Sequence, residues 1–133
     1  MKLLLPFVFL FVYQISSCQT TANPDTLKKS ALESYEAGNI AVSLAYFDSL
    51  ILILPSNDSF KIAEAFQLKG KVEMENNTYT AFNNAENAIL KAINLFKHLD
   101  EKASLYSCYQ YLGRINRKTK RPLKAKKYFH QSL

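Results

Sequence analysis

The sequence contains few of the residues that interrupt helices. It has three Gly and four Pro in 133 residues, whereas Ala, Leu, Lys, Asn and Glu recur. This composition favours helix, because Gly and Pro are the residues least compatible with a helix interior. No run alternates apolar and polar residues for long enough to predict a sheet. A chain of this length has room for one domain, and we expect that domain to be all-α.

Cysteine is also scarce, and the usual catalytic patterns are missing. Cys18 and Cys108 stand far apart, and no CxxC or Cys/His spacing predicts a disulfide framework or a metal site. His98 and His130 have no acid or second ligand at a useful spacing. The sequence has no Gly-rich phosphate loop, no Ser/His/Asp order and no pair of carboxylates suited to acid–base work. We therefore expect no catalytic residue, no metal and no cofactor, and a protein that is not an enzyme.

The apolar run at the start of the chain is too short to cross a membrane. It extends over Leu3–Ile15, about 20 Å of helix against the roughly 30 Å of a hydrocarbon core. A basic residue before a short apolar core, with small residues after it, is typical of a secretory signal. We predict a signal peptide over residues 1–17.

The end of that segment, Ile15-Ser16-Ser17-Cys18, resembles the bacterial lipoprotein box. The resemblance implies cleavage after Ser17 and diacylglycerol on the sulfur of Cys18. Residues 18–24 would then be the lipidated cysteine and a polar tether. The chain would be anchored by lipid in the envelope of a Gram-negative bacterium, facing the periplasm. An ordinary signal peptide, an uncleaved anchor and a cytosolic chain are the alternatives.

Acidic residues are missing from the end of the chain. Residues 111–133 hold eight Lys and Arg and no Asp or Glu, whereas residues 18–110 hold eight Lys against eleven acids. Such a basic segment can recruit nucleic acid, anionic lipid or an acidic protein face, or it can be the solvated outside of a helix pair. No aromatic side chain is predicted to be free there to stack on bases, so we expect no nucleic acid.

The same segment carries a pattern of small and bulky residues in two amphipathic stretches. Tyr109, Leu112 and Gly113 precede a basic turn, and Ala125, Phe129 and Ser132 follow it. A small residue lets two helices approach, and the aromatic residue fills the space between them. The pattern resembles a tetratricopeptide repeat. The resemblance implies a right-handed superhelical array, an α-solenoid, of about three helix pairs over 25–133, with the pairs at 25–55, 59–97 and 101–133.

Two earlier stretches fit the same register less closely. In the first, Gly38 is the turn glycine and Pro55 ends the second helix, although Leu50–Leu54 can also be a buried strand. In the second, helices are predicted at about 60–75 and 79–97, with about three extra residues in the turn between them. Asp100 is expected to cap the next helix.

In tetratricopeptide folds the first helix of each pair lines a groove that holds a peptide or protein partner. The resemblance assigns this role to twelve residues: Asp25, Lys28, Leu32, Tyr35, Glu64, Gln67, Lys71, Met74, Ser107, Gln110, Arg114 and Arg117. The expected function is a protein–protein interaction scaffold, with self-association through an uncapped last helix as a possibility. The alternative is the N-terminal sensory fragment of a longer repeat-containing signalling protein, a histidine kinase or a transcription regulator.

Overall fold

The computed structural model describes residues 22–133, and within them the chain forms six α-helices and no strand. The all-α prediction is therefore confirmed for this part of the chain. The predicted signal peptide and Cys18 lie outside the described residues. The helices are α1 (Pro24–Glu36), α2 (Ile40–Ile53), α3 (Ser59–Glu75), α4 (Tyr79–His98), α5 (Lys102–Lys118) and α6 (Pro122–Gln131).

Side-chain caps fix the starts of three helices. The Oδ1 atom of Asn23 accepts the backbone N–H of Asp25 at 2.9 Å, and Pro24 occupies the first turn, so α1 begins slightly earlier than the sequence predicts. Asp58 caps α3 and Thr78 caps α4 in the same way. Each cap provides an acceptor for a backbone N–H that has no partner inside the helix.

The α2 helix ends as predicted, just before Pro55. Helical structure continues through Ile53, and Leu54 is extended, with φ −64° and ψ 134°. A residue before proline is pushed out of the helical region by the proline ring, and proline itself has no N–H to donate. The strand alternative for Leu50–Leu54 is wrong.

The turns within the three pairs α1–α2, α3–α4 and α5–α6 share one geometry. Each has three residues, and its second residue has a positive φ: Gly38 at 81°, Asn77 at 50° and Lys120 at 58°. The left-handed conformation lets backbone N–H groups that follow the first helix donate to its last carbonyl oxygens, and the chain then reverses direction. The prediction of about three extra residues in the second turn is wrong, because this turn has the same length as the other two; the predicted bounds of the helices on either side agree with α3 and α4 to within one residue.

The prediction that Asp100 caps α5 is wrong. Asp100 has a φ of 55° and ends α4: its N–H donates to the Lys97 carbonyl at 3.3 Å, and the Glu101 N–H donates to the Phe96 carbonyl at 3.1 Å. Glu101 is the residue that precedes α5, and its side chain makes no capping hydrogen bond. An Asp tolerates the left-handed region better than most residues, which explains its place here.

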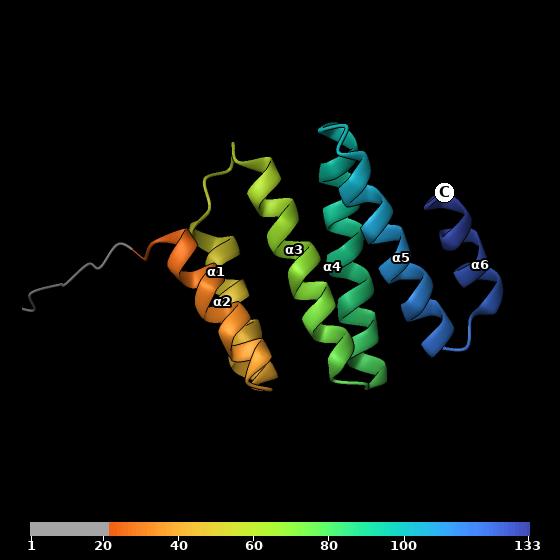
Figure 1. The fold of residues 1–133 in the computed structure, drawn as a ribbon, viewed down its shortest axis with the longest axis horizontal. Coiled ribbons are helices and arrows are strands. Elements are labelled where there is room, and N and C mark those ends of the chain that lie inside the picture. Colours follow the sequence, from red (N-terminus) through yellow and green to blue (C-terminus); the bar gives the residue numbers. More distant parts are fainter. Residues whose placement is uncertain (1–21) are drawn as a thin grey trace, which may run out of the picture.

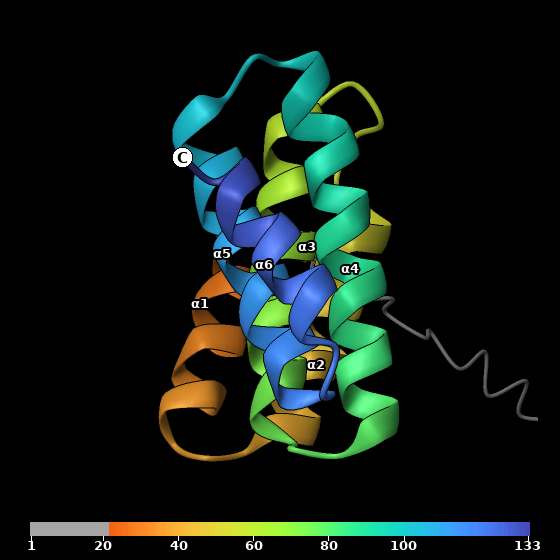
Figure 2. The ribbon, with the colours of Figure 1, turned by 90° about the vertical axis from the view of Figure 1, so that its right-hand side faces the viewer.

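The six helices stand in a row, from α1 and α2 at one end to α5 and α6 at the other (Figure 1). Each helix packs on its neighbour in sequence, and α3 also packs on α5. Seen from the α6 end, α1 and α5 lie on one side of the row and α4 on the other (Figure 2). One buried cluster joins α3, α4 and α5, and a second joins α1, α2 and α3.

Close approach within the pairs depends on small residues at predicted positions. A Cβ built on Gly70 would lie 2.6 Å from Ile89 Cδ1, and one on Gly113 would lie 2.4 Å from the Phe129 ring. In the first pair the Oγ atom of Ser43 donates to the carbonyl of Ala31 at 2.7 Å, with both residues fully buried. The predicted contact between a small residue and a bulky one is thus present in the second and third pairs.

Candidate partner-binding surfaces

Four of the predicted groove residues meet in two contacts between α1 and α3. The Nζ atom of Lys28 donates to Glu64 Oε2 at 2.8 Å, and the Nζ atom of Lys71 lies 5.5 Å from the centre of the Tyr35 ring. All four side chains are half-buried. The structure therefore brings these residues of α1 and α3 onto a common side.

The other predicted residues of α1 and α3 differ in exposure. Asp25 is exposed at the start of α1, whereas Leu32 and Gln67 are half-buried. Leu32 packs against the cluster between α1 and α3. Met74 is only 7% exposed and belongs to the core around α4. Its side chain therefore supports the fold.

The predicted residues on α5 divide between two surfaces. Ser107 is half-buried, and Arg114 is exposed, with its guanidinium 5.9 Å from the centre of the Tyr111 ring. Gln110 and Arg117 instead line a hollow at the α6 end of the row, where Gln110 Nε2 donates to Ser132 Oγ at 2.7 Å.

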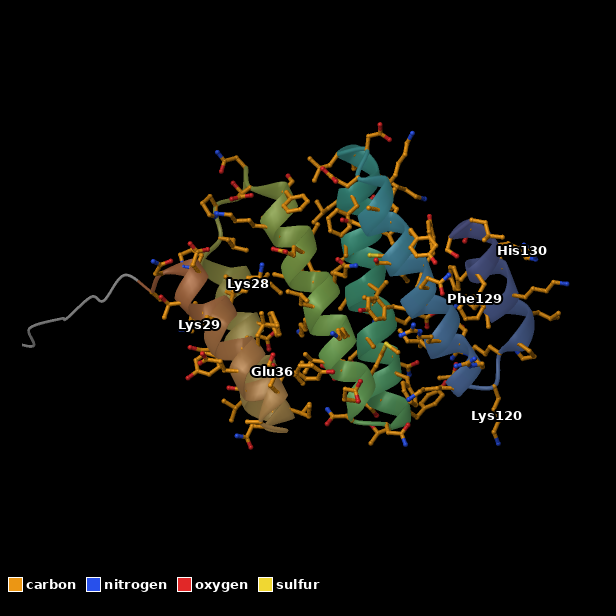
Figure 3. The ribbon with its side chains drawn as sticks, viewed as in Figure 1. Lys28, Lys29, Glu36, Lys120, Phe129 and His130 are labelled. Carbon is orange, nitrogen blue, oxygen red and sulfur yellow. The ribbon has the colours of Figure 1, made fainter. Side chains whose placement is uncertain are left out.

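That terminal hollow is mainly apolar with basic side chains around it. It is lined by Gln110, Arg117, Pro122, Ala125, Lys126, Phe129, His130 and Leu133. Figure 3 shows Phe129 and His130 on α6 at this end, with Lys120 in the turn below them and Lys28, Lys29 and Glu36 on α1 at the opposite end. No acidic side chain is among its lining residues. The hollow is therefore suited to an apolar group that carries acidic neighbours.

The basic segment is only partly free for a partner. Arg121 and Lys124 are held by Glu86 of α4, at 3.3 Å and 2.7 Å. The remaining six cations are exposed, and within residues 22–133 none has a carboxylate within ion-pair distance: Arg114, Arg117, Lys118, Lys120, Lys126 and Lys127. A concentration of positive charge without counter-charges attracts anionic partners.

Glu86 forms a buried polar cluster that sequence reasoning missed. Its carboxylate also accepts from Asn116 Nδ2 at 3.4 Å, and Asn116 Oδ1 is buried without a partner among the described residues. Burial alone would raise the pKa of the Glu86 carboxyl, but the hydrogen bond and charge of Lys124, with smaller contributions from Asn116 and Arg121, lower it below its usual value. The sequence does contain one sign of this cluster: Glu86 is an acidic residue in the helical stripe of Phe82, Ile89 and Ile93, which is otherwise apolar.

The core of the same region holds the only described cysteine. Cys108 is fully buried, and burial raises the pKa of its thiol to about 12. A thiol in this state is neither a nucleophile nor a metal ligand at neutral pH, because both roles need the thiolate. Among the described residues no group of His, Cys, Asp and Glu is arranged to hold a metal ion.

No known protein family, curated protein or solved structure matches this chain. In the part that the structure describes, no helix combines the length and the apolar character that crossing a membrane requires.

Proposed function

We propose that the protein is a non-enzymatic scaffold that binds a protein or peptide partner through an array of three tetratricopeptide-like helix pairs. The observation that carries this proposal is the repeated hairpin. Three consecutive pairs reverse direction through a three-residue turn with a left-handed second residue. Stacked helix pairs of one kind expose an extended surface, which is how repeat proteins bind their partners.

The contact surface in this proposal has two parts. The first is the side of α1, α3 and α5 that includes the Lys28–Glu64 pair and the Tyr35–Lys71 contact. The second is the basic end of the row, where exposed cations surround the terminal hollow. An extended or helical segment with acidic residues fits this combination, because its charges would meet the cations and its apolar side chains the hollow.

We further propose that Cys18 is lipidated and holds the chain in a Gram-negative envelope, facing the periplasm. The support is the resemblance of Ile15–Cys18 to a lipoprotein box. Mass spectrometry of the membrane fraction tests this directly: a mature protein that begins at a diacylglyceryl cysteine is expected. A free thiol on an exported soluble chain would exclude the anchor.

Reversing two charges tests the scaffold. The Arg114→Glu/Arg117→Glu double variant should lose captured partners, since both side chains are exposed on α5. The matched control is Lys97→Glu/Lys102→Glu, which makes the same charge change at exposed positions where α4 ends and α5 begins. Binding that both variants weaken equally would show only a dependence on net charge, and partners retained by the first variant would exclude the basic part of the surface.

The second candidate is the input region of a longer signalling protein. The terminal hollow favours it, because the apolar lining from Pro122 to Leu133 is a surface on which a further helix pair could pack. Reading the genomic frame beyond Leu133 decides between the two. A continuing frame with another helix pair would favour the sensor, and a stop codon would favour the scaffold.

A further inference from the structure

The α2 helix is unusually poor in charge for a helix at the end of a row. Its sequence, IAVSLAYFDSLILI, contains one charged residue, Asp48, whose carboxylate lies 2.6 Å from Lys69 Nζ of α3. Surface helices normally carry polar residues on the side that faces water, and a helix that is apolar all round is normally covered on every side. Within the described residues α2 is covered on one side only.

The uncovered side of α2 forms a continuous stripe, which we call the α2 stripe: Val42, Ala45, Ser49 and Leu52. These residues recur at the three- and four-residue spacing of one helix face. Val42 is 47% exposed and Leu52 is 85% exposed, with Ile53 beside them at 39%. The opposite side of the helix, at Ser43, Phe47 and Leu50, is buried. Three of the four residues are apolar and Ser49 is the polar one; an exposed stripe that is mainly apolar is typical of a surface that contacts something other than water.

The C-terminal end of α2, where the stripe ends at Leu52, lies near the point where the chain enters the fold. Pro24, the first residue of α1, lines the same hollow as Leu50 of α2 and Leu54, the residue that follows α2. Cys18 precedes Pro24 by six residues, which can span at most about 20 Å even when fully extended. A lipid on Cys18 therefore holds this end of the row close to the bilayer surface, and the α6 end is the far one (Figure 1).

We propose that the α2 stripe lies on the lipid bilayer and inserts Leu52 and Ile53 into the boundary between headgroups and acyl chains. The inference rests on the proposed lipid anchor. The anchor favours lipid over a protein partner, because it holds the α2 end of the row at the bilayer, and the stripe carries no charged residue that would oppose its burial there. The only charge on α2 is already neutralised by Lys69.

The experiment compares two leucines of equal exposure at opposite ends of the row. Leu52 on α2 and Leu123 on α6 are both 85% exposed. The full chain is made as Leu52→Cys and as Leu123→Cys, each labelled with an environment-sensitive fluorophore. Neither native cysteine competes for the label, because the Cys108 thiol is buried and the sulfur of a lipidated Cys18 carries diacylglycerol. Each labelled protein is placed in vesicles of phosphatidylethanolamine and phosphatidylglycerol that contain a spin-labelled quencher lipid.

The expected result is blue-shifted emission and severalfold stronger lipid quenching at position 52 than at position 123. Water-like emission at both positions, with a lipidated Cys18 found by mass spectrometry, would overturn the inference and leave the anchor in place. A blue shift at position 52 without lipid quenching would also overturn the inference, because it would show that a second copy of the chain, and not lipid, covers the stripe. An unmodified Cys18 on a chain that does not stay with the vesicles would refute the anchor as well as the stripe.

Discussion

Replacing Gly70 by Ala tests the close approach of α3 and α4 on which the middle of the row depends. The new Cβ would lie 2.6 Å from Ile89 Cδ1, 2.7 Å from Ile89 Cγ1 and 3.2 Å from the carbonyl oxygen of Ala85. Ile89 is fully buried in the larger core cluster, so its side chain has no solvent into which to turn. The carbonyl oxygen is part of a helix and cannot move aside alone.

Two opposing effects determine how much Gly70→Ala changes the free energy of unfolding. Overpacking a filled core by one methyl group costs about 1–3 kcal/mol. Ala in place of Gly inside a helix contributes about 1 kcal/mol in the opposite direction. The net effect is therefore a loss of about 0–2 kcal/mol in the free energy of unfolding. Because both a buried side chain and a backbone oxygen obstruct the new atom, we expect the upper half of this range, about 1–2 kcal/mol. Urea denaturation followed by circular dichroism measures it.

Gly113→Ala is the natural comparison. Its Cβ would meet the Phe129 ring at 2.4 Å, but this ring is only half-buried, beside the open terminal hollow. The ring can turn away, so the loss should be smaller than at Gly70. Combining Gly70→Ala with Ile89→Ala should recover at least about 1 kcal/mol relative to the sum of the single variants, since the new methyl fills space that Ile89 leaves.

Three results would refute this reasoning. If Gly70→Ala raises stability by the full helix-propensity gain, the helices are not in the contact that the distances describe. If Gly113→Ala is the more damaging of the two variants, the terminal ring is not free to move. If the double variant with Ile89→Ala is simply additive, the two side chains do not share the space between α3 and α4.

Three further predictions concern charge, the thiol and a turn. Glu86→Gln should cost about 1–2 kcal/mol at neutral pH, because a mostly buried carboxylate loses two partly exposed cationic partners. Folding lowers the pKa of Glu86 below its usual 4.5, so the stabilisation by its carboxylate is fully present above pH 4.5 and is lost as the pH falls through the folded pKa. The unfolding free energy of the variant should therefore decrease less steeply with falling pH than that of the native chain. In a Cys18→Ser chain, which leaves Cys108 as its one thiol, Cys108 should react with a thiol reagent at pH 8 only after unfolding in guanidinium. Absorbance of the released chromophore records the reaction, and rapid native reaction would contradict the burial of Cys108. Lys120→Gly should stabilise the chain by about 0.5–1 kcal/mol by relieving a left-handed backbone, whereas Lys126→Gly in the middle of α6 should destabilise it by about 1 kcal/mol in the same thermal melts.

The helices themselves could be predicted because local rules agree along most of the chain. Pro55 ends α2, and the prediction of a helix over about 60–75 differs from α3 by one residue at its start. The small residues Gly70 and Gly113 were recognisable because a glycine within an apolar helical stripe is typical of a close contact between two helices. These features depend on residues close together in the sequence, and short-range spacing is what a sequence displays directly.

The remaining features depend on contacts between segments far apart in the sequence. Asp100 and Lys120 occupy left-handed turn positions that Gly usually fills, so composition alone gave no signal for them. The partners of Glu86 lie 30 to 38 residues away, and they come together only because α5 packs on α4 and α6 packs on α5. Which neighbour covers each face of α5 depends on how the helices pack, and because α6 packs on α5, Gln110 and Arg117 line the terminal hollow.

The distance between the two ends of the row decides whether the exposed cations near α6 act on lipid headgroups or on a protein partner. If the α2 stripe lies on a bilayer, the shortest path to α6 crosses three helix contacts, α2–α3, α3–α5 and α5–α6. At about 10 Å for each contact, these place the α6 end roughly 20–30 Å away from the stripe. That distance exceeds the Debye length of about 8 Å at physiological ionic strength, so lipid headgroups contribute little to the potential there. The cations of the basic end then act on a protein partner. Lys126→Glu/Lys127→Glu, which reverses two exposed charges of α6, should weaken partner binding strongly while leaving the quenching of position 52 by anionic vesicles unchanged. A variant that loses its vesicle contact together with its partner would show that the basic end itself lies on the membrane.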